Sequence, residues 1–193
     1  MEAPSYPDDV IKGLVERKLP WSMVKRMMSA PKDRDRFEKY VKVLQERVPW
    51  KEKIVLPIHE HLFVVCKNGE LIVKAACGHE FGDYRENWKL KCLIRVRETN
   101  EDFKEVYPDF FEFDTEFIEL REFYCPGCGE LLDVENAPKG YPITFEFLPD
   151  VEGFYKEWLG KPVPCEKKEE SRAEDRSVNI LRKWAEEAEE KGS

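Results

Sequence analysis

The sequence predicts an α+β fold: N-terminal helices, then a mostly antiparallel β-rich domain that resembles a zinc ribbon, and a C-terminal helix. Apolar residues recur at helical spacing in the first 50 residues, and the period changes to that of strands from Ile54. Two short cysteine motifs, residues 77–79 and 125–129, lie in the β-rich part. With 193 residues, 41% of them hydrophobic, the chain has enough material for one domain of ordinary size and a small appendage.

The first 50 residues are expected to form a helical segment. Asp8 and Asp9 are placed to cap a first helix, which Pro20 would end. Residues 21–28 are expected to form a short turn. A stronger helix is predicted from Pro31 onward because apolar residues return at helical spacing: Phe37, Tyr40, Val41, Leu44 and Val48.

The strongest strand signal is Asn68-Gly69 between two β-rich runs, residues 62–66 and 70–74, which predicts a hairpin. Residues 89–97 alternate, and their lysines and arginines are expected on the face opposite the apolar side chains. Further strands are predicted over residues 116–124, 130–134 and 142–147, with a short helix over 101–106 and a helical element over 150–159.

These patterns divide the chain into four regions. Residues 1–50 form the N-terminal helical segment and 51–162 the zinc-ribbon-like domain. Residues 163–176 are a charged linker, and 177–193 an amphipathic helix that Ser177 is placed to cap. This last helix carries Trp184 on its apolar face, which is expected to dock either on the chain itself or on a partner.

The cysteine motifs indicate a metal site. Cys125-Pro-Gly-Cys128 is typical of a zinc knuckle, in which a tight turn points two thiolates at one ion. Cys77 and His79 would add one thiolate and one imidazole. Together, Cys77, His79, Cys125 and Cys128 would close a tetrahedron around zinc, and a closed site of this kind usually has a structural role.

Two alternative sites are considered. In the first alternative, Cys125 and Cys128 would form a redox dithiol. That motif normally opens a helix, whereas a strand-like segment follows here. In the second alternative, His59 and His61 would lie on one face of a strand and hold a catalytic zinc. Of the other cysteines, Cys66 and Cys92 are expected to act as small hydrophobes in strands, and Cys165 as an exposed free thiol.

Composition argues against several classes of function. The net charge is −8 and the isoelectric point is near 5.2, which disfavours a sequence-independent grip on nucleic acid. No apolar run approaches the roughly 18 residues of a membrane span and no signal peptide is evident, so a cytoplasmic location without membrane association is expected. Phosphate-binding, dinucleotide-binding and serine-hydrolase motifs are absent from the sequence, so the chain is not expected to catalyse a reaction alone.

Four stretches resemble the gamma subunit of acetone carboxylase and related ketone carboxylases: residues 18–32, 77–89, 124–129 and 154–160. The resemblance implies a cytoplasmic α2β2γ2 complex that carboxylates a ketone with bicarbonate and ATP to a β-keto acid such as acetoacetate. It places ATP and the catalytic divalent metal on the alpha and beta subunits, and zinc with a scaffolding role on the gamma subunit. The tail from Cys165 to Ser193 extends beyond the usual end of the family.

The leading hypothesis is therefore a non-catalytic, zinc-stabilised subunit of an ATP-dependent ketone carboxylase. The N-terminal helices and the turn from Asp83 to Trp88 are expected to contact the larger subunits, because tyrosine, arginine and tryptophan are enriched at interface hot spots. The alternatives are a stand-alone zinc-ribbon adaptor for protein or nucleic acid, and a small zinc hydrolase that uses His59 and His61.

Overall fold

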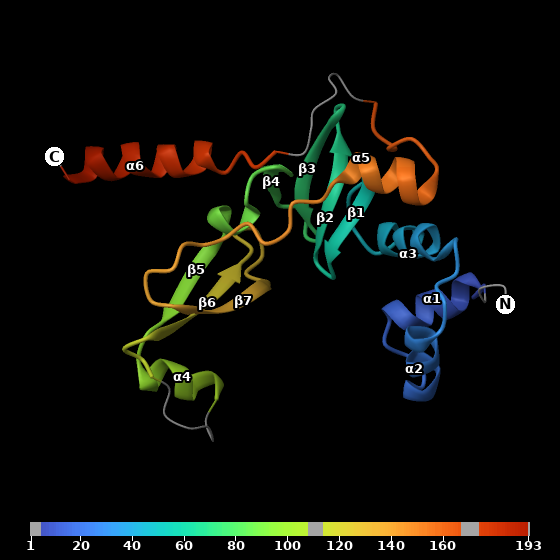
Figure 1. The fold of residues 1–193 in the computed structure, drawn as a ribbon, viewed down its shortest axis with the longest axis horizontal. Helices are drawn as coiled ribbons and strands as arrows, with labels where there is room; N and C mark the ends of the chain where they lie inside the picture. Colours follow the sequence, from blue (N-terminus) through green and yellow to red (C-terminus); the bar gives the residue numbers. More distant parts are fainter. Residues whose placement is uncertain (1–4, 108–113, 167–173, 193) are drawn as a thin grey trace.

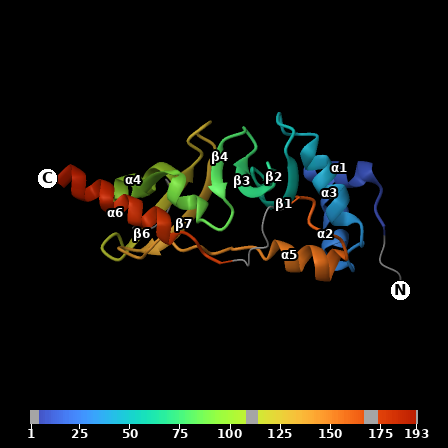
Figure 2. The same cartoon turned by 90° about the horizontal axis from the view of Figure 1, so that it is seen from above.

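The computed structural model describes residues 5–107, 114–166 and 174–192, and its architecture is the expected α+β (Figure 1). Two antiparallel sheets lie side by side, one of four strands and one of three. Three N-terminal helices lie beside the first sheet, and the C-terminal helix extends away at the other end (Figures 1 and 2). In the described residues, no helix is long and apolar enough to cross a membrane.

The N-terminal segment contains helices α1 (Asp8–Val15), α2 (Trp21–Ser29) and α3 (Arg36–Gln45). One side chain from each helix, Ile11, Met27 and Val43, forms their common buried cluster. The prediction of a short turn at residues 21–28 was wrong, because the apolar side of that stretch packs in this cluster as a helix. Asp8 and Asp9 lie in the first turn of α1 and do not cap it.

The first sheet contains β1 (Lys53–His59), β2 (Leu62–Lys67), β3 (Glu70–Ala75) and β4 (Glu80–Asp83), paired in that order. The predicted hairpin is confirmed. Asn68 and Gly69 both have positive φ, 54° and 82°, as a tight two-residue turn between twisted strands requires.

Both faces of this sheet are buried. Along β2, Phe63 and Val65 face the cluster that α3 covers, while Leu62 and Val64 face the larger core. The larger core also includes Cys125 and Leu132, which lie in a turn and a strand of the second sheet. Tyr155 completes this core, and its hydroxyl donates to the Val55 carbonyl at 2.8 Å. This explains why β2 is apolar from Leu62 to Cys66, whereas a strand with one face in solvent would alternate apolar and polar residues.

The second sheet contains β5 (Leu93–Arg97), β6 (Ile118–Tyr124) and β7 (Leu131–Pro138), paired in that order. A 3₁₀ turn, η1 (Trp88–Lys91), precedes β5, and helix α4 (Asn100–Val106) follows it. The predicted short helix is thus confirmed, with a capping box between Thr99 and Asp102. Strand β7 runs four residues beyond the predicted end at 134.

The prediction for residues 89–97 was wrong in two respects. The strand begins only at Leu93, and the burial is reversed at several positions: Lys89 and Arg97 are buried, whereas Val96 of the predicted apolar face is 41% exposed. The reason is specific ion pairing. Arg97 Nε lies 3.0 Å from the buried Glu122 carboxylate, and a period of two cannot show which face such a pair will occupy.

The C-terminal third begins with a long irregular stretch, and the strand predicted over residues 142–147 is absent there. The helical element predicted over 150–159 is present as α5 (Val151–Gly153) and the π-helical η2 (Phe154–Leu159). Helix α6 (Val178–Gly192) projects away from both sheets in Figure 1, and Leu181 and Trp184 are exposed on it. The linker predicted over 163–176 lies partly outside the described residues.

The turn after β4 is covered by the chain's own tail. Arg176 N donates to the Arg85 carbonyl at 2.8 Å, and the Ser177 hydroxyl accepts from Asn87 N at 2.8 Å instead of capping α6. Tyr84, Asn87 and Trp88 are buried. Tyr84 and Trp88 are therefore not available to a partner, and contact of residues 83–88 with the larger subunits stays a prediction.

Candidate metal centre

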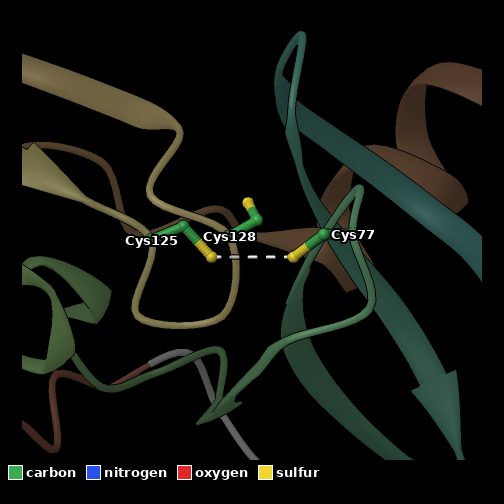
Figure 3. A group of neighbouring side chains, drawn as sticks. All are labelled: Cys77, Cys125 and Cys128. Atoms are coloured by element: carbon green, nitrogen blue, oxygen red, sulfur yellow. Dashed lines mark hydrogen bonds between the residues drawn. The ribbon is translucent and has the colours of Figure 1, made fainter.

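Three thiols from two distant parts of the chain meet between the two sheets (Figure 3). Cys77 follows strand β3, Cys125 follows β6, and Cys128 precedes β7. The Sγ atoms of all three lie within 4.8 Å of one another, and those of Cys77 and Cys125 are 3.7 Å apart. Cys125 is buried while Cys77 and Cys128 are exposed, so the group lies at the surface edge of the larger core.

The donors and their spacing fit zinc. Two sulfurs bound to one tetrahedral zinc, each at about 2.3 Å, are about 3.8 Å apart. The separation of the Cys77 and Cys125 sulfurs, 3.7 Å, matches this value. Three thiolates leave one position of the tetrahedron for a fourth ligand.

Backbone N–H groups donate to two of the thiols, Cys77 and Cys125. Burial raises the pKa of Cys77, but hydrogen bonds from the His79 backbone N–H and from the other two thiols outweigh burial, so this pKa lies below its ordinary value. Burial raises the pKa of Cys125 to about 11, although the backbone N–H groups of Gly127 and Cys128 oppose it. A bound cation would stabilise both thiolates.

His79 lies next to the three thiols but is not one of the mutually close donors. Its ring packs edge-on against Phe81, with centroids 4.9 Å apart. Its other neighbour is the turn of residues 125–129. A Cβ added at Gly127 would lie 2.8 Å from His79 Cβ and 3.3 Å from His79 Nδ1. The two motifs thus touch through a position that only glycine fills without displacement.

His59 and His61 have separate environments. His59 Nδ1 accepts the backbone N–H of His61 at 3.2 Å, and burial lowers the pKa of its imidazole. His61 Nε2 lies 3.6 Å from a Glu130 carboxylate oxygen. Neither imidazole belongs to a group of three close metal donors in the described parts of the chain.

A second group of close donors, Asp133, Glu135 and Glu146, already holds a cation. Lys89 Nζ lies 2.6 Å from both Asp133 and Glu135 and 3.2 Å from Glu146. The carboxylates keep the pKa of this buried lysine above its ordinary value. Sequence reasoning missed this cluster because its members are spread over three segments with no motif.

The remaining cysteines differ from expectation in part. Cys66 and Cys165 form a disulfide, so the expectations of a small hydrophobe at 66 and a free thiol at 165 were wrong. Their sequence separation of 99 residues gave no signal of pairing. Cys92 is a half-buried free thiol just before β5 and not in a strand, and burial raises its pKa to about 12.

Known proteins with similar sequences bear on this arrangement. The family model described as "Acetone carboxylase gamma subunit" matches residues 48–159, which include both cysteine motifs. The acetone carboxylase gamma subunit of Xanthobacter autotrophicus is 43% identical over 162 residues, which cover 83% of this chain and 96% of that protein. The acetophenone carboxylase beta subunit of Aromatoleum aromaticum is 33% identical over 78 residues, 39% of this chain and 60% of that protein.

The family match spans both sheets, the three thiols and the element that ends at Leu159, and it stops before α6. This chain belongs to the acetone carboxylase gamma subunit family.

Proposed function

We propose that this chain is the zinc-binding, non-catalytic gamma subunit of an ATP-dependent ketone carboxylase that converts a ketone and bicarbonate to a β-keto acid such as acetoacetate. Family membership supports the complex, since the two relatives are named as subunits of acetone and acetophenone carboxylases. The meeting of three thiols from two sheets supports the zinc.

Zinc would act here as a clamp between the sheets. Cys77 reaches the site from the end of β3, whereas Cys125 and Cys128 reach it from the β6–β7 connection. Metal bound by all three would join the sheets with strong bonds, and in small metal-binding domains such binding contributes directly to folding. His79, which touches Gly127 of the opposite knuckle, is our candidate for the fourth ligand.

The larger subunits would carry the chemistry. In our proposal, alpha and beta subunits in an α2β2γ2-like complex bind ATP and a catalytic divalent metal, and the complex works in the cytoplasm without nucleic acid. The zinc hydrolase alternative lacks support because His59 and His61 share no third donor in the described residues.

Purification of the tagged full chain from its native host tests the complex. We expect two larger subunits in stoichiometric amount, and ATP hydrolysis in the eluate that depends on both ketone and bicarbonate. A zinc-loaded chain that elutes alone as a monomer would refute the subunit role and favour a stand-alone adaptor.

The clamp is tested separately with Cys125→Ser and, as the matched control, Cys92→Ser. Both replace a cysteine sulfur that is not exposed with oxygen, but only Cys125 belongs to the close thiol group. We expect Cys125→Ser to lose zinc, measured by atomic emission, and to lose the larger subunits, whereas Cys92→Ser keeps both. Full zinc content in Cys125→Ser would contradict the proposed ligand set.

A further inference from the structure

The disulfide between Cys66 and Cys165 fastens an irregular segment onto the first sheet. Cys66 is fixed within the ladder, paired with Lys53 on one side and Leu71 on the other. Cys165 lies on the segment after Gly160, which has no regular structure up to residue 166. The Cys165 N–H donates to the Val163 carbonyl two residues earlier, at 2.8 Å. Cys66 is therefore held within the sheet, whereas Cys165 lies on a segment without regular structure.

Cys165 also lines a groove. The groove has a volume of about 550 Å³ and is lined by Glu152, Lys156, Gly160, Lys161, Pro162, Val163 and Cys165. Cys66 does not line it. A nucleophile in this groove would thus lie next to Cys165, and attack on the Cys165 sulfur would make Cys66 the leaving group.

The charged residues of the groove favour a negatively charged nucleophile. Its lining holds two lysines against one glutamate. Lys161 forms an ion pair with Glu38 of α3. Lys156 is exposed and forms no ion pair with any residue that the structure describes. Glu152, the one carboxylate of the lining, has an interaction of its own, so Lys156 is the cation of the groove that can attract a negatively charged reactant.

We propose that the Cys66–Cys165 disulfide is a thiol–disulfide exchange site, opened by a small anionic thiol that enters this groove and attacks Cys165. The thiolate forms a new S–S bond with Cys165 Sγ as the Cys66–Cys165 bond breaks, and Cys66 leaves with the electron pair and takes a proton from solvent. A second molecule of the thiol then attacks the adduct. The products are a free Cys165 thiol and the disulfide of the small thiol, so two thiols are oxidised for each protein disulfide reduced.

Opening the bond has a local structural consequence. The segment from Gly160 to Cys165 loses its covalent attachment to β2, whereas the start of α6 keeps its separate contacts through Arg176 and Ser177. Reduction is therefore expected to raise amide hydrogen exchange in residues 160–166 and to leave residues 83–88 protected.

The test uses the full, zinc-loaded chain, first equilibrated with oxidised glutathione. A digest without reductant should contain the peptide pair linked through Cys66 and Cys165. Reduced glutathione, which is anionic, is then added, and samples are quenched in acid, alkylated and mapped by mass spectrometry. We expect the glutathione adduct on Cys165 and the alkyl label on Cys66. Absence of the linked pair, or an adduct on Cys66 instead, would overturn the proposal.

The role of charge is tested with a second thiol and a matched pair of variants. Cysteamine, which is cationic, should open the bond several-fold more slowly than glutathione at equal thiolate concentration. Lys156→Gln should slow glutathione and not cysteamine, whereas Lys139→Gln, at an exposed position that does not line the groove, should change neither rate. Equal rates for both thiols, or equal effects of both variants, would refute selection of an anionic thiol.

Discussion

The sulfurs of Cys77 and Cys125 lie 3.7 Å apart although 48 residues separate them in the chain. Each sulfur comes at the end of a different sheet, so their meeting depends on how the two sheets pack and not on either motif alone. Metal binding should therefore report on the packing of the sheets. Mutations at the contact between residues 77–79 and residues 125–129 should change the zinc affinity even when no ligand is changed.

The contact between Gly127 and His79 gives the first prediction. In Gly127→Ala the new methyl group would lie 2.8 Å from His79 Cβ, which cannot rotate away because it is bonded to the backbone. We expect weaker zinc binding in a chelator competition assay, and a loss of about 1–3 kcal/mol in the free energy of unfolding from overpacking.

Gly140→Ala is the control for Gly127→Ala. Gly140 has a positive φ of 75° but no atom within 4 Å of an added Cβ. This variant should lose about 1 kcal/mol from backbone strain and keep normal zinc affinity. Unchanged zinc affinity in Gly127→Ala would show that the two knuckles do not need this close approach.

The buried cation at position 89 gives the second prediction. Lys89→Met removes the ammonium group that three carboxylates share, and it leaves Asp133 close to Glu135 with only the longer 3.8 Å contact of Glu135 with Arg121 as a counter-charge. We expect a loss of about 3–5 kcal/mol in the free energy of unfolding, measured with urea, because breaking a buried ion pair strands the remaining charge.

The surface pair of Lys67 and Glu80 provides the control for that measurement. Its nitrogen–oxygen distance is also 2.6 Å, but the two side chains are 38% and 34% exposed. Lys67→Met should cost less than about 1 kcal/mol. A similar loss in both variants would mean that burial does not set the value of the Lys89 cluster.

The features that sequence reasoning predicted correctly are local ones. The Asn68-Gly69 turn requires positive φ in both residues, and its two strands are neighbours in the chain, so the hairpin follows from a short stretch. Helix α4 is equally local, because Thr99 and Asp102 cap it three residues apart. The pair Cys125 and Cys128 was visible for the same reason.

The features that were missed depend on tertiary packing. The alternation of residues 89–97 predicts which side chains share a face, but not that Arg97 would be buried against Glu122. The Cys66–Cys165 disulfide joins positions 99 residues apart, and α2 becomes a helix through packing of Met27. These outcomes follow from contacts that no short stretch contains.

The third prediction concerns the pH dependence of stability at His59. Burial holds the pKa of this imidazole below 6.5, so between its folded pKa and 6.5 the unfolded chain binds more protons than the folded chain. The contribution of His59 to stability is therefore present above pH 6.5 and falls as the pH is lowered through this window.

His59→Asn tests this, since its side-chain oxygen can still accept the His61 backbone N–H. We expect the stability of the wild-type chain to fall more steeply than that of the variant between pH 7.5 and 5.5, measured by urea unfolding at saturating zinc. Release of zinc at low pH affects both chains and cancels in the comparison. Parallel curves would contradict a depressed His59 pKa, which nuclear magnetic resonance titration of the ring would measure directly.

The last prediction separates the base of helix α6 from its length. Ser177→Ala removes the hydroxyl that accepts the buried Asn87 N–H at 2.8 Å, and an unpaired buried donor costs about 1–3 kcal/mol. Stopping the chain after Arg182 removes most of α6, including the exposed Trp184, but keeps Ser177.

We expect the shortened chain to stay within about 0.5 kcal/mol of the full chain in urea unfolding, because residues 183–189 are exposed. Ser29→Ala, which removes an exposed hydroxyl bonded only within its own helix, should be equally mild. If the shortened chain lost as much stability as Ser177→Ala, helix α6 would have to pack on the body along its length. If Ser177→Ala matched Ser29→Ala, the hydrogen bond to Asn87 would contribute nothing to anchoring the tail.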